Sequence, residues 1–444
     1  MSLDKLFARH IDTLQQRYEE TLELLDNEGI RIDAVLLHSG RLQPYFADDI
    51  SIPFRAHGHF RHWVPLNLPD QAVLVQPGCK PVLYRVQPQS FWLDTSVECE
   101  SWWADSFEMV EASGRDELLE LLPGLQRTAF MGEDTAYASR IGLTSQLYNE
   151  THLRNRLDHH RSLKTPYEID QIRSANRVAL RGHRAAEEAF FNGKGERDIH
   201  LAYLNACQAT EQDLPFPSIV ALDEKSAILH YEPKRRTDSA GARVMLCDAG
   251  YTVRGYAADL TRTYVRDSAH PVFRNLVDEV ARIKDRMVSA AQAGKSFKDL
   301  NQEAHDLVRT ALRETGVIRG GDEESREHRI SNLFFPHGTG HLLGLQVHDV
   351  SGLFKDETGV LEPPPDEHKA LRLTRRLEDG MVYTVEPGIY FIPMLLNAER
   401  KSEKGKLLNF ALIDELMSCG GIRIEDNVVI RNGGAENLTA EENK

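Results

Sequence analysis

The sequence predicts a mixed α/β (α+β) protein built of two domains. Residues 1–160 alternate helical and strand patterns, a helix start stands near residue 165, and strand-like runs become frequent after it. At about 150 residues per domain, a chain of 444 residues has room for two or three domains that each bury a core. We therefore expect an N-terminal mixed-sheet α/β domain over residues 1–160 and a second domain over residues 161–444.

The first domain is expected to combine a long helix with a mixed sheet. Apolar residues recur at helical spacing over residues 6–27, and residues 34–37 form a short apolar run typical of a buried strand. The runs 72–75 and 82–86 are separated by a segment with Pro77-Gly78, which predicts a hairpin. Residues 128–131 are a further predicted strand.

The clearest domain boundary is Thr165-Pro166-Tyr167-Glu168. It has the form of a capping box with proline at the first helical position, so a long helix should open the second domain there. Three later stretches are charged or rich in proline and are predicted to be surface loops; they are residues 320–329, 363–365 and 399–406.

Composition excludes several classes of function. The chain has 53 Lys+Arg against 68 Asp+Glu, a net charge of −15, whereas a nucleic-acid binder needs a basic face. No stretch reaches the roughly 18 apolar residues of a membrane span, and the N-terminus shows no apolar leader. The five cysteines form no C-x-x-C pair, which suits reduced thiols. We expect a cytoplasmic protein without nucleic-acid or membrane partners.

Two strand-like runs, 244–250 and 255–264, each contain one aspartate. If a two-residue turn falls at Val253-Arg254, Asp248 and Asp259 face each other across a hairpin with Cβ atoms about 5 Å apart. Like charges in that position repel, so a divalent metal between them is the functional interpretation. A pair of solvent-facing turn aspartates is the alternative, and the hairpin alone does not decide between the two.

Two glutamates lie in similar apolar runs. Glu386 ends the run 381–385 and precedes Pro387-Gly388, which stops a strand. In residues 420–430, strand alternation places Arg423, Glu425 and Asn427 on one face. A carboxylate embedded in an apolar strand is unfavourable unless it is paired or bound to a metal. Any single acid is explained by a buried salt bridge, but four of them are not easily explained that way.

Residues 335–349 contain His337, His341 and His348, interleaved with glycines that interrupt a regular helix. The segment is not H-E-x-x-H, and its glycines do not open a helix after a strand, so zincin and dinucleotide-binding interpretations fail. A single histidine is most often structural. Three on a glycine-rich loop favour metal ligands or acid/base groups.

The charges of these residues fit a two-metal centre. Asp248, Asp259, Glu386 and Glu425 would neutralise two divalent ions, and one neutral histidine would complete the set. Oxygen ligands with a single imidazole suit Mn²⁺, and also Co²⁺ or Fe²⁺, better than structural zinc. Two such ions about 3.5–4 Å apart can hold a bridging hydroxide and polarise a carbonyl or phosphoryl oxygen. The residues thus predict metal-assisted hydrolysis.

Together these segments resemble the five-ligand set of the pita-bread metallopeptidases, a family that includes methionine aminopeptidase, aminopeptidase P and prolidase. Within it the sequence is most similar to bacterial prolidases, the Xaa-Pro dipeptidases, and to the organophosphorus acid anhydrolases close to them. The matching segments are 228–231, 255–263, 345–350, 371–375 and the N-terminal Phe46-x-Asp48-Asp49, so the resemblance covers nearly the whole chain. It implies a pita-bread fold for the second domain.

The resemblance also assigns the metal ligands. It implies that Asp248 binds one ion, that His341 and Glu386 bind the other, and that Asp259 and Glu425 bridge them. Glu386 would also be the general base, taking a proton from the bridging water as it attacks the scissile carbonyl.

For the substrate, the resemblance implies that His348, His337 and His230 stabilise the tetrahedral intermediate and hold the peptide. Arg372 and Arg423 resemble arginines at the substrate end, where a guanidinium would grip the free C-terminal carboxylate of a dipeptide.

The N-terminal domain is expected to mediate dimerisation and to cover the pocket. In relatives, residues matching Asp49 and Trp92 reach the substrate pocket, Asp49 from the partner subunit of a homodimer; a surface aspartate and a core tryptophan are equally open interpretations. Phe297 stands where relatives often have tyrosine, so a pocket hydroxyl is missing.

Three hypotheses follow. The leading one is a homodimeric, manganese-dependent Xaa-Pro dipeptidase that releases C-terminal proline. An organophosphorus triester hydrolase is the second, because a phosphoryl centre can use the same bridging hydroxide. A pita-bread protein that binds without catalysing is the third, and the presence of all five ligand residues argues against it.

Overall fold

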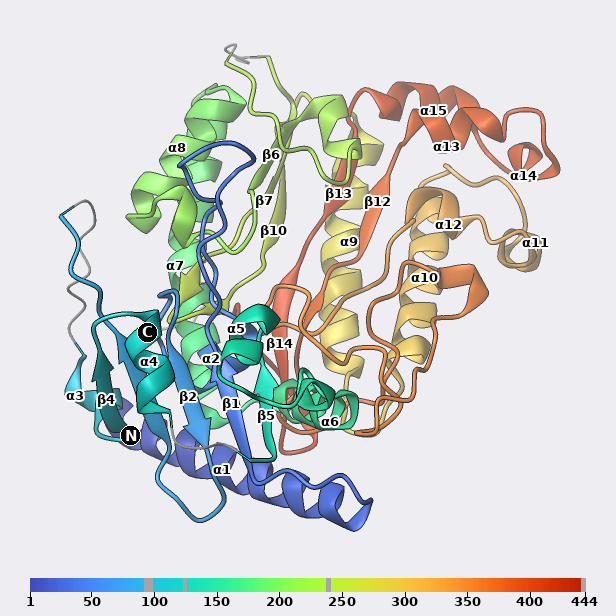
Figure 1. The fold of residues 1–444 in the computed structure, drawn as a ribbon. Helices are drawn as coiled ribbons and strands as arrows, with labels where there is room; N and C mark the ends of the chain where they lie inside the picture. Colours follow the sequence, from blue (N-terminus) through green and yellow to red (C-terminus); the bar gives the residue numbers. More distant parts are fainter. Residues whose placement is uncertain (92–98, 123–125, 237–240, 441–444) are drawn as a thin grey trace. The chain divides into compact units, whose positions relative to one another are not determined.

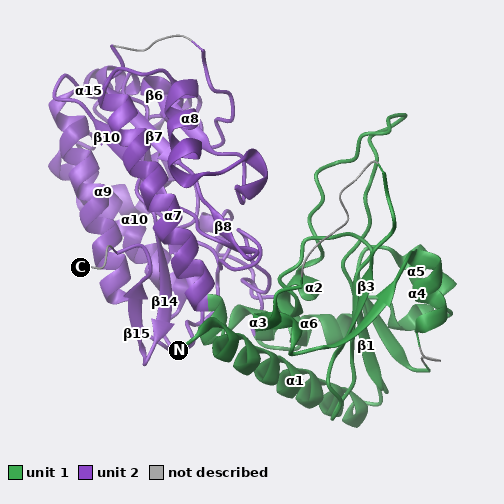
Figure 2. Cartoon of the chain, turned by 90° about the vertical axis from the view of Figure 1, so that its left-hand side faces the viewer, with its two compact units in different colours: residues 1–168, 356–360 green, residues 169–355, 361–444 purple. Residues whose placement is uncertain are grey.

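The computed structural model describes residues 1–91, 99–122, 126–236 and 241–440 (Figure 1). The chain forms two compact units (Figure 2). Unit 1 contains residues 1–168 and 356–360, and unit 2 contains residues 169–355 and 361–444. Both units combine helices with strands, which confirms the predicted mixed α/β class.

Unit 1 is built on a five-stranded mixed sheet with the order β4-β3-β2-β1-β5. β1 pairs antiparallel with β2 and parallel with β5, while β3 pairs antiparallel with β2 and parallel with β4. Every residue of β1, β2 and β5 is buried, which is why these strands appear in the sequence as continuous apolar runs. The predicted hairpin and strands are confirmed, and β4 is a strand that was not predicted. The strands are β1 (Ala34–His38), β2 (Ala72–Val75), β3 (Val82–Val86), β4 (Glu108–Ala112) and β5 (Thr128–Met131).

The long predicted helix of unit 1 is α1 (Leu3–Asn27), which lies against α6 (Thr151–Ser162). Its buried residues include Phe7, Ile11 and Leu14, the spacing of one helical face. The other helices of the unit are short; they are α2 (Gly58–Trp63), α3 (Ser101–Ala104), α4 (Arg115–Leu121), α5 (Thr135–Arg140) and the 3₁₀ turn η1 (Ser145–Leu147).

Helix α7 (Pro166–Phe191) begins at the predicted capping box. The backbone N–H of Thr165 donates to Glu168 Oε2 over 2.8 Å, and the backbone N–H of Glu168 donates to Thr165 Oγ1 over 3.5 Å. The two residues therefore satisfy each other's free amides, as a capping box should. The apolar face of the helix is buried along its length through Ile172, Ala175, Ala179, Ala186 and Phe190.

The strands of unit 2 form several small sheets rather than one large one. β7 lies between β6 and β10, β14 lies between β11 and β15, and β8–β9 and β12–β13 are two-stranded ribbons. The strands are β6 (Ile219–Leu222), β7 (Val244–Asp248), β8 (Thr252–Val253), β9 (Tyr256–Ala257), β10 (Thr261–Val265), β11 (Val382–Val385), β12 (Gly388–Tyr390), β13 (Gly421–Arg423), β14 (Asp426–Arg431) and β15 (Gly434–Asn437).

The register of the β7–β10 hairpin differs from the predicted one. The turn falls at Arg254-Gly255, both with positive φ (48° and 95°), and Asp248 pairs with Thr261 instead of Asp259. A tight hairpin turn of this kind needs positive φ at both central residues, which the β-branched Val253 disfavours and Gly255 adopts easily. The register moves by two residues, so Asp248 and Asp259 still project from the same face.

Helices surround these sheets. The longest after α7 are α9 (Pro271–Ala290) and α10 (Phe297–Glu314), which pack against each other. None of the helices in the described ranges is long and apolar enough to cross a membrane. The remaining elements are α8 (Glu196–Cys207), α11 (Asp322–Glu327), α12 (Ser331–Phe334), α13 (Pro393–Ala398), α14 (Glu403–Lys406), α15 (Phe410–Met417) and the 3₁₀ turns η2 (Glu211–Asp213), η3 (Asp223–Ala227) and η4 (Asp366–His368).

Two of the three predicted loops contain short helices. Helix α11 occupies most of residues 320–329, and α14 lies within residues 399–406. In α11, acidic residues fill the first turn and Arg326 lies in the last, an arrangement that the helix dipole favours. The charge pattern that suggested a loop therefore belongs to a solvated helix.

Candidate metal centre

Thr261, at the start of β10, brings two of the predicted metal-binding strands together. It pairs with Asp248 at the end of β7, and it forms an isolated bridge with Glu425, which lies between β13 and β14. Its hydroxyl also donates to Glu425 Oε2 over 2.7 Å. Because β10 starts two residues after Asp259, three of the four predicted carboxylates converge on this one strand end.

The glycine-rich loop and β11 supply the other two predicted ligands. The backbone N–H of Thr384 donates to His341 O, and that of Glu386 donates to Thr339 O, so the loop runs alongside β11. At Gly340 a Cβ atom would lie 1.9 Å from Thr384 O. Only glycine permits this close approach, which places His341 next to Glu386.

Distances place four of the five predicted side chains at one site. His341 Nε2 lies 3.4 Å from Asp259 Oδ2 and 3.6 Å from Glu386 Oε1. Ligand atoms of Asp259, His341 and Glu425 all lie within 4.8 Å of one another, and all three residues are buried. The remaining acid, Asp248, acts electrostatically on both Glu386 and Glu425.

The carboxylates are destabilised by burial and by one another. Burial raises the pKa of Asp248 to about 6 against the opposing charge of Arg423, and Asp259 adds to the rise. Burial likewise raises the pKa of Glu386 to about 7, and that of Glu425 well above its ordinary value, with Asp259 contributing to both. Four acids in one buried site therefore lack sufficient positive charge from the protein alone.

Divalent metal ions fit this donor set. Asp248 Oδ1 is buried and has no hydrogen-bond partner in the part of the chain that the structure describes. His341 Nδ1 lies 3.0 Å from Leu342 O, so Nδ1 carries the proton and leaves Nε2 with a lone pair toward the carboxylates. The site thus offers carboxylate oxygens and one imidazole nitrogen, as an oxygen-preferring divalent ion requires.

Several residues support these ligands in ways that the sequence did not predict. Arg423 donates to Asp248 Oδ2 over 2.6 Å, to Thr261 Oγ1 over 3.1 Å and to the Tyr390 hydroxyl over 2.7 Å. Asn427, whose face was predicted but not its role, exchanges two hydrogen bonds with the backbone of Asp259. The role of Tyr390 could not be predicted from the sequence, because only the β12–β13 pairing brings this residue to the site. The role of Thr261 could have been predicted, because it lies two positions after Asp259 and strand alternation places both residues on the same face.

The three predicted substrate histidines are close to this centre or to one another. His337 Nε2 is 2.9 Å from the Tyr390 hydroxyl, and its Nδ1 is 3.5 Å from Glu386 Oε2. The ring of His348 makes an edge contact with that of His341, with centroids 4.4 Å apart. His230 is exposed after η3 and acts electrostatically on both His337 and His348. Burial lowers the pKa of His337 to about 3 and that of His348 to about 4, so both rings are neutral.

The two predicted arginines have different surroundings. The guanidinium of Arg423 is buried and its three nitrogen atoms donate within the protein, so it positions Asp248 and Tyr390. Arg372 is exposed. Its charge helps to lower the pKa of His348, although burial and the charge of His341 have larger effects. Of the two, Arg372 is the one whose guanidinium remains accessible to a ligand.

Three further residues were singled out in the sequence. Asp49 is exposed in an irregular segment of unit 1, and Trp92 lies outside the described residues. Phe297 is 1% exposed and packs edge-on against Tyr383, with ring centroids 5.5 Å apart. The ring atom Cζ, which would carry the missing hydroxyl, lies 3.2 Å from where a Cβ atom of Gly340 would stand, so this position faces the glycine-rich loop next to His341.

Known proteins share both halves of this architecture. Residues 170–432 match the profile of Metallopeptidase family M24, and residues 5–159 match that of the Xaa-Pro dipeptidase N-terminal domain. The Xaa-Pro dipeptidase of Pseudoalteromonas atlantica is 37% identical over 443 residues, with 98% of each chain covered. That of Serratia proteamaculans is 38% identical over 445 residues, covering 100% of this chain and 99% of its own.

Solved structures show the same fold. The low-pH form of Escherichia coli aminopeptidase P superposes with a TM-score of 0.72 at 23% identity, covering 96% of this chain and 95% of its own. A zinc-substituted form of that enzyme in complex with product gives 0.71 over the same coverage. The fold of the chain is therefore the predicted pita-bread architecture preceded by an α/β domain.

The fold and the buried carboxylates define a metallopeptidase, and the chain belongs to metallopeptidase family M24. Within that family it groups with the bacterial Xaa-Pro dipeptidases, since both its halves match them along almost their full length. It is thus an enzyme whose class works with divalent metal ions.

Proposed function

We propose that this enzyme is an Xaa-Pro dipeptidase with a dinuclear metal centre, which releases proline from the C-terminus of dipeptides. The observation that carries the proposal is the convergence at one site of His341 and four carboxylates, of which three are buried and that of Glu386 is half-buried. Four negative charges balance two divalent ions, and the oxygen-rich ligand set favours Mn²⁺. Curated relatives named Xaa-Pro dipeptidase, 37–38% identical along the whole chain, support the substrate class.

In this proposal Asp248 would hold one ion, His341 and Glu386 would hold the other, and Asp259 and Glu425 would be shared ligands of both. Two such ions would lower the pKa of a bound water and polarise the scissile carbonyl. Glu386 would take the proton of the attacking water, and its pKa, which is raised to about 7 in the unneutralised site, supports this role. Neutral His337 and His348 hydrogen-bond the substrate as its carbonyl becomes tetrahedral.

Recognition of a dipeptide needs a cation for the free carboxylate. We assign that role to Arg372, whose exposed guanidinium lies within electrostatic reach of His348. His230 is placed on the same side and would contribute to substrate binding. Arg423 supports the reaction indirectly, because its donors already hold Asp248 and Tyr390.

We further propose that the enzyme is a homodimer in which unit 1 contributes Asp49 to the partner's site. The segment around Asp49 exposes large apolar side chains, with Phe46 fully accessible and Ile50 63% exposed. A second copy would remove this apolar surface from water. Trp92 would serve the same pocket. The five cysteines are free thiols, which supports a cytoplasmic location.

The decisive experiment is hydrolysis of Leu-Pro by the purified protein, with and without added Mn²⁺, and by the Asp259→Asn variant. We expect proline release that depends on the metal and is lost in the variant. Hydrolysis that survives complete chelation would contradict the proposal. Metal analysis that finds no bound divalent ion in a folded, reconstituted sample would instead favour a non-catalytic binding protein.

An organophosphorus triester hydrolase remains the second candidate, because the same centre would polarise a phosphoryl oxygen. The ratio of kcat/KM for Leu-Pro to that for a phosphotriester, measured on one preparation, separates the two. The accessible Arg372 favours the dipeptide, since a neutral triester has no carboxylate for it to bind.

A further inference from the structure

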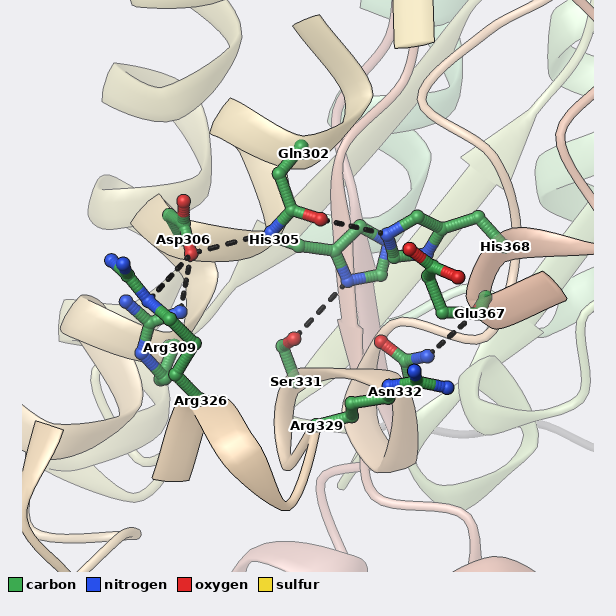
Figure 3. Close-up of a pocket in the computed structure, with 10 residues that line it drawn as sticks. All are labelled: Gln302, His305, Asp306, Arg309, Arg326, Arg329, Ser331, Asn332, Glu367 and His368. Carbon is green, nitrogen blue, oxygen red and sulfur yellow. Dashed lines mark hydrogen bonds and ion pairs between the residues drawn. The ribbon is translucent and has the colours of Figure 1, made fainter. Parts of the chain in front are cut away.

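Unit 2 contains a second candidate site, a cavity of about 300 Å³ between α10, α11 and η4 (Figure 3). None of its lining residues belongs to the carboxylate centre. A cavity of this size is at the lower end of pockets that hold small organic molecules. The residues that matter for its chemistry are His305, Arg309, Arg326, Arg329, Glu367 and His368.

One wall of the cavity is a rigid stack of rings. The imidazoles of His305 and His368 stack with centroids 4.1 Å apart, and Phe335 stacks on the other face of His305 at 4.6 Å. Gln302 fixes His368 through a 3.2 Å hydrogen bond. His305 is 2% exposed, and its Nε2 has no hydrogen-bond partner among the described residues. The wall is therefore preorganised.

The charges around this wall are only partly paired. Arg309 is buried and held by Asp306 and Asp322, so its charge is neutralised within the protein. Arg326 approaches Asp306 only to 3.7 Å. Arg329 and Glu367 also line the cavity, yet neither forms an ion pair in the ranges that the structure describes.

The two unpaired charges of opposite sign act on the same wall. Burial lowers the pKa of His368, Glu367 opposes this shift, and Arg329 adds to it, so both charges are felt at this ring. Asn332 donates to the backbone carbonyl of Glu367 over 2.7 Å, which fixes the position of that residue. The cavity thus presents a cation and an anion beside the flat face of a stack of imidazole rings.

We propose that this cavity binds a free α-amino acid as its zwitterion. The carboxylate of the ligand would lie at Arg329 with Arg326 beside it, the ammonium group at Glu367, and the side chain against the His368–His305 stack. A simple anion would be repelled by the carboxylate of Glu367, and a simple cation would be repelled by the guanidinium of Arg329. A zwitterion satisfies both charges at once.

Binding is best measured with three related probes: L-alanine, N-acetyl-L-alanine, which lacks the ammonium group, and L-alaninamide, which lacks the carboxylate. Ligand-observed NMR titrations of the metal-loaded enzyme give a Kd for each. The Arg329→Ala and Glu367→Gln variants remove the two proposed contacts one at a time. Arg282→Ala and Glu279→Gln on α9 are matched controls, because these residues form a surface ion pair remote from the lining residues.

We expect wild type to bind L-alanine at least about tenfold more tightly than either derivative, which corresponds to about 1.4 kcal/mol. Arg329→Ala should abolish the preference for L-alanine over L-alaninamide, and Glu367→Gln the preference over N-acetyl-L-alanine. Both control variants should behave as wild type. Binding that is unchanged in the cavity variants would place the amino acid elsewhere, for example at the metal centre, and would overturn the proposal. Equal loss of all three probes, or no binding of L-alanine, would overturn it as well.

Discussion

Two buried clusters of this protein bring together the same types of ligand. In unit 1, His10, His62 and Glu168 place candidate ligand atoms within 4.8 Å of one another, as Asp259, His341 and Glu425 do in unit 2. In unit 1, His62 Nε2 lies 3.3 Å from Glu168 Oε1, a separation similar to that between His341 and Asp259. By distance and burial alone, either cluster would be a metal site.

The charges of the two clusters differ. Burial alone would raise the pKa of Glu168, but His62, His10 and the Thr165 backbone N–H lower it well below its ordinary value. The unit 1 cluster therefore stabilises its single carboxylate without a metal. In unit 2 the pKa values of Asp248, Glu386 and Glu425 are all raised, because four acids share the site.

This contrast shows that ligand geometry is insufficient to identify a metal centre. What distinguishes the unit 2 cluster is an excess of buried negative charge that the protein leaves uncompensated. We therefore expect substitutions to change the metal content in unit 2 and only the stability in unit 1.

The largest effect is expected for Glu425→Gln. In the proposed two-metal centre, loss of this charge should reduce the bound metal from two ions to at most one per chain, and kcat/KM for Leu-Pro by about 10³-fold or more, since metal catalysis supplies several kcal/mol. Elemental analysis and steady-state kinetics measure both. Glu403→Gln, on the exposed helix α14, is the matched control and should keep both metals. A fully active Glu425→Gln enzyme would remove the distinction between the clusters.

Thr261→Val should have a smaller effect on the same centre. The substitution keeps the shape of the side chain but removes the hydroxyl that donates to Glu425 and accepts from Arg423. We expect a 10- to 100-fold loss of metal affinity or of kcat/KM, the usual range for residues behind metal ligands. Thr263→Val, two residues further along β10, removes a hydroxyl that bonds only the Arg423 backbone and should change activity less.

His62→Gln should leave both activity and metal content unchanged. It removes the imidazole beside Glu168, so we expect the free energy of unfolding to fall by about 1–3 kcal/mol, as for other buried polar contacts. Urea denaturation of the metal-loaded protein measures the change. Loss of one metal ion per chain in this variant would show that the unit 1 cluster also binds metal.

The smallest effect concerns acid stability. Burial lowers the pKa of His62 to about 3, so between pH 6.5 and pH 5.5 the unfolded chain takes up a proton at this residue and the folded chain does not. Stability therefore falls as the pH drops, by about 1 kcal/mol across this interval from this residue. Over the same pH interval, the free energy of unfolding of the His62→Gln variant should fall by about 1 kcal/mol less than that of the wild-type protein. Glu168 adds nothing to this difference, because a lowered carboxyl pKa acts only below about pH 4.3.

The sequence by itself determined the mixed α/β class, the capping box at Thr165 and the residues of the proposed metal centre. Apolar runs reveal buried strands, and acids at their ends are recognisable because they are unfavourable there without a partner. The glycine at position 340 likewise indicates an irregular backbone from the sequence alone. The contact with Thr384 that it permits could not be predicted in this way.

Only the tertiary structure decided how these residues work together. The positive φ values of Arg254 and Gly255 set the hairpin register, and the β12–β13 pairing brings Tyr390 to Arg423. Arg423 was expected at the substrate, but three donor atoms already bonded inside the protein make it a support for Asp248. Strand and helix patterns report short-range preferences along the chain, whereas the positive charge that pairs with Asp248 comes from Arg423, 175 positions away, and only folding brings the two into contact.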